Sequence, residues 1–363
     1  MSEILENSQN FSINNDNKAL PDSAVSKIRC DRMSNLGLKS STTTTEMNTR
    51  AQRRWRLLAR ALTRSPELRV ENGEEDERIS VRRFTTFGLV NPFVLENVVG
   101  DEESTWYEYR AKIDEKSYAI EIREINKTFT ANELIGFNNT GNICVWPSEE
   151  CLAHYLLTNR EICEDKMILE LGGGMSCLAG VFAAKYCGPA GVTLTDGNVT
   201  SVDNARCIVA RNKMNEFIKC GVVQWERAAR ALRQDNANAN HVHQSWTTES
   251  GDECRRTPGE GLYDVILSAD CLFFDEARLD LVETIFGWLA DNGIALIVAP
   301  RRGSTFQKFR DAAIQRGFAT KQREIYDPIV WSRHLELMEH NQEYCPDLHY
   351  PVLLELTKQK APG

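Results

Sequence analysis

The stretch Glu170-Leu171-Gly172-Gly173-Gly174-Met175-Ser176 decides the fold of this chain, because it joins two segments of different periodicity. Residues 167–170 (Met-Ile-Leu-Glu) form a short apolar run typical of a buried strand, and residues 178–186 have a helical pattern. Glycines between them let the backbone turn tightly and approach a ligand closely. The free N–H groups at the start of the helix can bind that ligand. We therefore expect a ligand-binding strand–loop–helix unit; the alternative is a glycine-rich turn without a ligand.

The chain around this loop alternates strands with helices. The other predicted strands are residues 192–196, 222–225, 265–269, 294–298 and 352–356. One predicted helix ends near residue 212, and a second is marked by an apolar stripe from residue 279 to 289. Strands that alternate with helices predict a parallel sheet with helices on both faces. The sequence therefore predicts an α/β domain over residues 146–363, with the polar residues 227–261 as a surface insertion.

The first 145 residues have a different composition. Residues 1–49 are rich in Asn, Ser and Thr and poor in large apolar side chains, so we expect a disordered tail. Residues 50–64 hold six arginines and no acidic residue, and their apolar residues recur at helical spacing. This basic amphipathic helix could dock an acidic partner, or lie on the domain with its arginines in water. Period-two alternation in residues 118–122 indicates a strand, so residues 50–145 are expected to hold this helix and a small antiparallel β element.

Overall composition excludes several classes of protein. The 363 residues carry a formal net charge of −9, which argues against a nucleic-acid partner. No apolar run reaches the roughly 20 residues of a membrane helix, and the first residues lack a signal-peptide pattern. Eleven scattered cysteines indicate reduced thiols, so we expect a cytoplasmic protein, with entry into the nucleus left open. No His or Cys spacing typical of zinc is present, and no metal ion is expected.

Asp196 helps to identify the ligand. It ends the second predicted strand, 22 residues after Gly174, where a carboxylate can bind both hydroxyls of a ribose. A dinucleotide loop needs a third glycine where this chain has Cys177, so a pyrophosphate fits poorly. Glu170, just before the loop, suits a cationic ligand better than a polyanion. Loops of this form bind S-adenosylmethionine, which we favour over NAD.

A second motif, Asp270-Cys271-Leu272-Phe273-Phe274, follows the fourth predicted strand. The carboxyl ends of parallel strands face the ligand crevice, so a carboxylate and aromatic rings there could hold an amine. The alternative is a helix cap followed by two core phenylalanines. Cys271 has no base near it in the sequence, which indicates a structural thiol.

In these motifs the sequence resembles the class I (seven-β-strand) S-adenosylmethionine-dependent methyltransferases, and within them the branch that methylates lysines of non-histone proteins. Longer blocks are similar to members of that branch that methylate calmodulin: residues 79–84, 141–150, 170–180, 195–198, 269–273, 299–303 and 348–353. The resemblance covers about residues 79–358. It implies a Rossmann-like seven-stranded sheet, mostly parallel with an antiparallel C-terminal strand. It also implies transfer of up to three methyl groups from S-adenosylmethionine to a lysine of calmodulin.

The resemblance also implies a set of site residues. The cofactor-binding positions carried over are Trp146, Glu170, Gly172, Gly173, Gly174, Asp196, Trp225 and Ala269. Among these, Asp196 would hold the ribose and Trp225 would lie near the adenine, while Trp146 would line the amino-acid end. Asp270 and Phe273 would position the target lysine. Ser176 stands where the wider class has a glycine, and a side chain of this size still fits the loop.

Three alternatives stay open. The enzyme could methylate another non-histone protein, or the chain could be a non-catalytic module that recruits calmodulin through its basic helix. A dinucleotide oxidoreductase is the third. Because calmodulin is acidic, docking needs a local positive patch, and residues 50–64, Arg82-Arg83 or Arg301-Arg302 could supply it. The sequence determines neither the modified lysine nor the oligomeric state.

Overall fold

The computed structural model describes residues 86–96, 104–125, 144–237, 244–247, 253–256 and 263–359. The predicted tail (1–49), the predicted basic helix (50–64) and Arg82-Arg83 lie outside the described residues.

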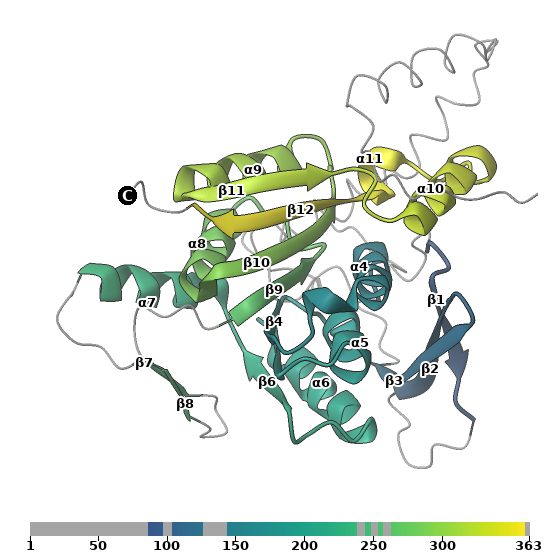
Figure 1. The fold of residues 1–363 in the computed structure, drawn as a ribbon, viewed down its shortest axis with the longest axis horizontal. Coiled ribbons are helices and arrows are strands. Elements are labelled where there is room, and N and C mark those ends of the chain that lie inside the picture. Colours follow the sequence, from purple (N-terminus) through teal and green to yellow (C-terminus); the bar gives the residue numbers. More distant parts are fainter. Residues whose placement is uncertain are drawn as a thin grey trace, which may run out of the picture. The chain divides into compact units, whose positions relative to one another are not determined.

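The main sheet has seven strands: β4 (Met167–Leu171), β5 (Gly191–Asp196), β6 (Ile218–Val222), β9 (Tyr263–Ala269), β10 (Leu289–Pro300), β11 (Phe318–Arg323) and β12 (Pro351–Lys358). Their order is β11-β12-β10-β9-β4-β5-β6 (Figure 1). The pairs among β6, β5, β4, β9 and β10 are parallel, whereas β12 is antiparallel to both of its neighbours. The predicted seven-stranded, mostly parallel sheet with an antiparallel C-terminal strand is therefore confirmed.

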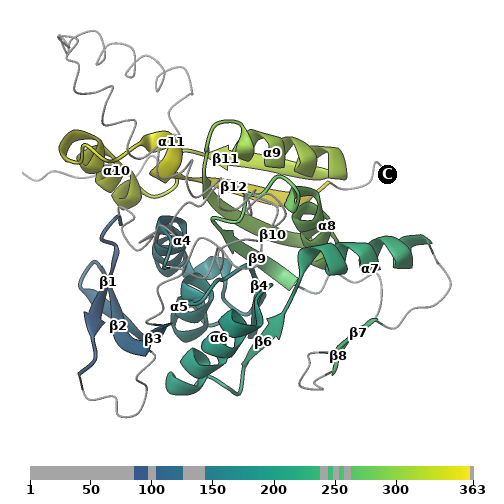
Figure 2. The same ribbon diagram turned by 180° about the vertical axis from the view of Figure 1, so that it is seen from behind.

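Helices follow most of the strands: α4 (Pro147–Thr158), α5 (Leu178–Tyr186), α6 (Val199–Arg211), α7 (Trp225–Ala237), α8 (Arg278–Trp288), α9 (Thr305–Arg316), α10 (Pro328–His340) and α11 (Pro346–His349). From β4 the chain moves through β5 to β6, and from β9 it moves the other way to β10. Right-handed crossovers then place α5 and α6 on one face of the sheet and α8 on the other. Both views show α4 beside α5, and α8 beside α9 (Figures 1 and 2).

The predicted N-terminal β element is a three-stranded antiparallel sheet of β1 (Val90–Val94), β2 (Ser104–Ile113) and β3 (Lys116–Ile125). It is tied to the main domain by hydrogen bonds. The backbone N–H of Ala119 donates to the Tyr186 hydroxyl at 2.9 Å, and that hydroxyl donates to the Ala119 carbonyl at 2.7 Å. The Glu150 carboxylate of α4 accepts N–H groups from Phe87, Leu89 and Val90. Glu150 therefore anchors the segment before β1.

One predicted strand is wrong. We expected a strand at residues 222–225, but β6 ends at Val222 and Trp225 begins α7. The physical reason is pairing and burial: Ile218 to Val222 pair with β5, whereas Ala228 and Ala229 are buried on α7, which packs on α8. An apolar run alone does not reveal this choice.

The predicted insertion 227–261 begins as a helix, because α7 runs to Ala237. Beyond it, β7 (Gln244–Thr247) pairs with β8 (Glu253–Arg256) as an antiparallel hairpin. The outer limits of the insertion stay a prediction. Within the described part of the chain, no helix has the length and apolar character needed to span a bilayer.

Candidate active site

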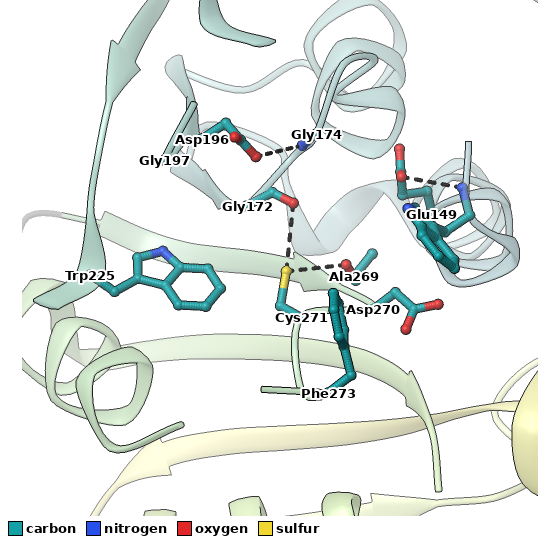
Figure 3. Close-up of a pocket in the computed structure, with 11 residues that line it drawn as sticks. Glu149, Gly172, Gly174, Asp196, Gly197, Trp225, Ala269, Asp270, Cys271 and Phe273 are labelled. Carbon is teal, nitrogen blue, oxygen red and sulfur yellow. Dashed lines mark hydrogen bonds between the residues drawn. The ribbon is translucent and has the colours of Figure 1, made fainter. Parts of the chain in front are cut away.

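The candidate site lies at the carboxyl ends of β4, β5 and β9, where the order of the strands reverses. The connections leave β4 and β9 in opposite directions, which opens a crevice between the loops that follow them. A pocket of about 480 Å³, including its open mouth, occupies this place (Figure 3). Its lining residues are Trp146, Glu149, Gly172, Gly174, Asp196, Gly197, Trp225, Ala269, Asp270, Cys271 and Phe273.

Of the ten residues predicted from the sequence, all except Glu170 and Gly173 line this pocket. They come from segments more than 120 residues apart, from Trp146 before α4 to Phe273 after β9. The fold therefore brings the predicted cofactor and lysine positions to one place, while their individual roles stay predictions.

Glycine is required at two positions of the loop. A Cβ on Gly172 would lie 2.6 Å from Cys271 Sγ and 2.9 Å from the Trp225 indole, and the residue has a φ of +69°. A Cβ on Gly173 would lie 2.5 Å from Cys177 Sγ. Any side chain would therefore push the loop away from its neighbours, and at Gly172 it would enter the space beside the pocket.

Asp196 is almost fully buried and holds the loop that carries Gly174. Its Oδ2 accepts the backbone N–H of Gly174 at 2.9 Å, and its Oδ1 accepts that of Asn198 at 2.8 Å. Burial raises its pKa to about 6, although these N–H groups oppose the rise. The Ser201 side chain and the backbone N–H of Gly197 also donate to this carboxylate, so ribose hydroxyls would share its oxygens with these donors or displace them. The geometry fits the predicted role.

Glu170 lies behind the loop instead of in the pocket. It is 1% exposed, and its Oε2 accepts the backbone N–H of Gly180 at 3.2 Å. Its Oε1 has no hydrogen-bond partner among the described residues. Burial, and then the nearby Glu149, raise its pKa to about 8. Glu170 therefore does not line the pocket, whereas Glu149 does.

Three residues that line the pocket were not among those predicted: Glu149, Gly197 and Cys271. Glu149 is the charged one. It lies in the first turn of α4, is 3% exposed and lines the pocket. Its Oε2 accepts from Ser176 Oγ at 2.6 Å and its Oε1 from the Trp146 backbone N–H at 3.3 Å. Burial raises its pKa to about 8. The signal was the Trp-Pro-Ser-Glu-Glu stretch, but acids in a first helical turn are common caps.

Asp270 forms a buried ion pair with Arg302. The guanidinium contacts both carboxylate oxygens, with Nη2 to Oδ2 at 3.0 Å, and Ser148 Oγ donates to Oδ2 at 3.3 Å. The charged carbon of Arg302 lies 6.0 Å from the Trp146 ring centre and 5.8 Å from that of Phe273. The charge of Asp270 is therefore balanced, and the pair lies against two aromatic rings.

This ion pair bears on the docking hypothesis for Arg301-Arg302, which stays a prediction. The Arg302 side chain is 10% exposed and bound to Asp270, and Arg301 pairs with Glu324 at 3.2 Å. Of the two, Arg302 is buried in its ion pair, whereas the Arg301 side chain is 39% exposed at the surface. The thiol of Cys271 has a pKa raised by burial, which agrees with a structural role. No cluster of three metal-ligating side chains exists in the described ranges.

Glu149→Gln is expected to stabilise the ligand-free protein at alkaline pH. The folded-state pKa of Glu149 is about 8, above the ordinary 4.5, so the folded state binds this proton more tightly. Stability is then lost as the pH rises from about 4.5 to 8, by up to a few kcal/mol at about 1.4 kcal/mol per pKa step. Gln cannot ionise. The free energy of unfolding in urea should therefore be higher for the variant than for the wild type, and this difference should grow between pH 6 and 8.5. An equal difference at both pH values would contradict this.

The residues present suit S-adenosylmethionine. Gly172 lets the loop pack directly against Cys271 and Trp225, and the Asp196 carboxylate lines the same pocket. Two of the pocket-lining carboxylates, Glu149 and Asp196, have no basic side chain bound to them among the described residues. An acidic pocket of this kind fits a cofactor that carries sulfonium and ammonium groups.

Comparisons with known proteins agree with this fit. Residues 128–242 match the family model described as lysine methyltransferase. The chain is 28% identical over 319 residues to calmodulin-lysine N-methyltransferase of Arabidopsis thaliana, covering 84% of this chain and 96% of that protein. It is 26% identical over 195 residues to protein-lysine N-methyltransferase EFM3 of Chaetomium thermophilum, covering 52% of each.

Among solved structures, a TehB-like SAM-dependent methyltransferase of Corynebacterium glutamicum aligns with a TM-score of 0.36 and 16% identity, over 57% of this chain and 88% of that one. The assignment of this chain rests on the family model, on the two related proteins and on its own sheet and pocket. Together these support an S-adenosylmethionine-dependent lysine methyltransferase.

Proposed function

We propose that this enzyme methylates a lysine of calmodulin, up to the trimethylated state. The observation that carries the proposal is the arrangement of Asp270, Phe273 and Trp146 beside the glycine loop in one pocket, where a lysine could meet the cofactor. Calmodulin as the substrate is supported by the similarity to the Arabidopsis protein named calmodulin-lysine N-methyltransferase, 96% of whose length is aligned.

The residues that would hold the cofactor are those that approach it with backbone or ring atoms. Gly172 and Gly174 would contact it through the backbone, Asp196 would bind the ribose, and Trp225 would stack on the adenine. When bound, the cofactor supplies a methyl group already activated by its sulfonium. The protein therefore has to align the lysine amine with that methyl group, which is a task of proximity and orientation.

The lysine must react as a neutral amine, although its ordinary pKa is about 10.4. An isolated aspartate would hold the protonated form. Asp270 is neutralised by Arg302, so it can orient the amine without trapping it as an ammonium. The rings of Trp146 and Phe273, 6.4 Å apart, desolvate the amine and can face the methylated cation that forms. The proton leaves to water.

Arg302→Gln tests this charge balance. Without the guanidinium, Asp270 would stabilise the lysine ammonium, so the amine's pKa in the complex should rise. We expect kcat at pH 7.5 to fall about tenfold and to recover at higher pH, because one pKa step is a factor of ten. Arg302→Lys should keep most of the wild-type pH profile. A Gln variant that loses the same fraction of kcat at every pH would assign Arg302 a purely structural role.

The proposed function is tested by intact-mass spectrometry of unmethylated recombinant calmodulin incubated with the enzyme and S-adenosylmethionine. We expect a mass gain of three methyl groups, absent with Asp196→Ala. An unchanged calmodulin mass, together with normal cofactor binding by calorimetry, would overturn calmodulin as the substrate. It would leave the lysine methyltransferase assignment in place.

Docking of the acidic calmodulin needs positive charge on the enzyme, and we propose that residues 50–64 and Arg82-Arg83 supply it. KM for calmodulin should then rise several-fold between about 50 and 300 mM salt, because screening weakens long-range attraction. The affinity for S-adenosylhomocysteine, measured in parallel, should change little. Truncation of residues 1–70 should raise KM but leave kcat measurable, whereas a non-catalytic recruiting module has no kcat to retain. A salt-independent KM would contradict the docking proposal.

We also propose that the enzyme works in the cytoplasm. The nine cysteines whose side chains are described are all free thiols, which suits a reducing compartment.

A further inference from the structure

We propose that Glu149 accepts the α-ammonium group of S-adenosylmethionine and makes the site selective for a cofactor that is positively charged at its amino-acid end. This inference rests on the cofactor assignment above and identifies the group that holds the amino-acid half. Its chemistry is that of a carboxylate paired with a primary ammonium.

The first argument is position. Trp225 and Asp196, which would bind the adenine and the ribose, lie toward one side of the pocket (Figure 3). Glu149 lies at the opposite side, beyond Gly172 and Gly174. A cofactor whose nucleoside occupies the Trp225 side therefore extends its amino-acid part toward Glu149.

The second argument is that Glu149 accepts hydrogen bonds from donors at the start of α5. Ser176 donates to its Oε2, and the backbone amide of Leu178, the first residue of α5, also stabilises the carboxylate. In dinucleotide enzymes the corresponding helix start binds the pyrophosphate. Here the Glu149 carboxyl group occupies that position and accepts these donors. A phosphate would have to displace it, so Glu149 disfavours a dinucleotide.

The third argument is charge balance. The groups near Glu149 are acidic or neutral: Glu170 from β4, Asp270 after β9, the Tyr109 phenol from β2 and the thiols of Cys177 and Cys271. The nearby cation, Arg302 after β10, is engaged by Asp270. Among the described residues, no basic side chain forms an ion pair with Glu149. A ligand ammonium would supply the missing positive charge, and it would convert a carboxyl of pKa about 8 into a carboxylate.

The test compares two ligands that differ in the amino-acid part. S-adenosylhomocysteine carries the α-ammonium, whereas 5′-methylthioadenosine has the same nucleoside and thioether without it. Calorimetry at pH 8.5 should show that Glu149→Gln lowers the affinity for S-adenosylhomocysteine about 10- to 100-fold. The affinity for 5′-methylthioadenosine should stay within about threefold of the wild-type value. Glu216→Gln, an exposed glutamate on the loop before β6, should change neither affinity.

The outcomes separate this inference from the proposed function. An equal loss for both ligands would overturn it, because Glu149 would then act only by holding the loop through Ser176. Failure of the wild type to bind S-adenosylhomocysteine at all would instead overturn the cofactor assignment. The wild type offers an independent check that needs no variant. The ratio of the two affinities should shift toward S-adenosylhomocysteine as the pH rises from 6 to 8, and a constant ratio would also overturn the inference.

Discussion

Asp196→Ala is expected to lower the affinity for S-adenosylhomocysteine at least about 100-fold, because two charge-assisted hydrogen bonds to the ribose are lost at about 1.5–3 kcal/mol each. The variant also frees the backbone N–H of Gly174, which Asp196 Oδ2 accepts at 2.9 Å, so the loop loses its anchor. Calorimetry measures the loss directly, and methyl transfer should fall below detection.

The effect can be assigned to Asp196 by two companion variants. Asp196→Asn keeps one acceptor oxygen for Gly174 but loses the charge, so its affinity should lie between wild type and Ala. Asp203→Ala removes an exposed carboxylate of the following helix α6, paired with Arg206 at 2.6 Å, and should bind normally. Normal affinity of Asp196→Ala would remove this residue from the site.

The same carboxylate predicts a pH dependence of cofactor binding. Burial raises the pKa of Asp196 to about 6 in the ligand-free protein, and only the ionised form accepts both ribose hydroxyls. Affinity should therefore be full above about pH 7 and decline as the pH falls through 6. Asp196→Asn should lack this decline.

Asp270→Asn is expected to reduce kcat about 100- to 1,000-fold while the affinity for S-adenosylhomocysteine stays within about threefold, because misorientation of the amine affects the reaction and not the cofactor. Asn is the suitable replacement, since Asp270 has a φ of +57° and Asn tolerates this left-handed conformation better than Ala does. Single-turnover kinetics with calmodulin, alongside calorimetry, separates the two effects.

The folding stability of Asp270→Asn must be measured separately, because this variant leaves Arg302 buried without its charged partner. Removing one partner of a buried ion pair costs about 3–5 kcal/mol. The double variant Asp270→Asn with Arg302→Gln should recover much of that stability and still turn over slowly. Asp275→Asn, an exposed neighbour that pairs with Arg278, should leave kcat unchanged. Wild-type kcat in folded Asp270→Asn would show that this carboxylate does not position the lysine.

Hydrophobic periodicity was sufficient to predict those strands and helices whose pairing and packing follow the same pattern. Strands β4, β5 and β9 and helices α5 and α8 lie where the apolar runs and the helical stripe predicted them. The predicted strand at 222–225 failed because Trp225 is equally compatible with a strand end and with a buried helix start. Its indole packs beside Gly172, and the helix that it begins packs on α8; no short window of sequence contains either contact.

By itself, the sequence determined the glycine loop, the acid at the end of β5 and the Asp270-to-Phe273 motif. Each of these is a residue type at a fixed place relative to its own strand. Only the tertiary structure decided the charge partners. Asp270 meets Arg302 because β9 and β10 are adjacent and parallel, so that their carboxyl ends lie together. Glu149 meets Ser176 because α4 packs on α5. Whether a buried carboxylate is neutralised or left to bind a cation depends on the neighbours that the sheet order brings to it, and that order is set by non-local packing.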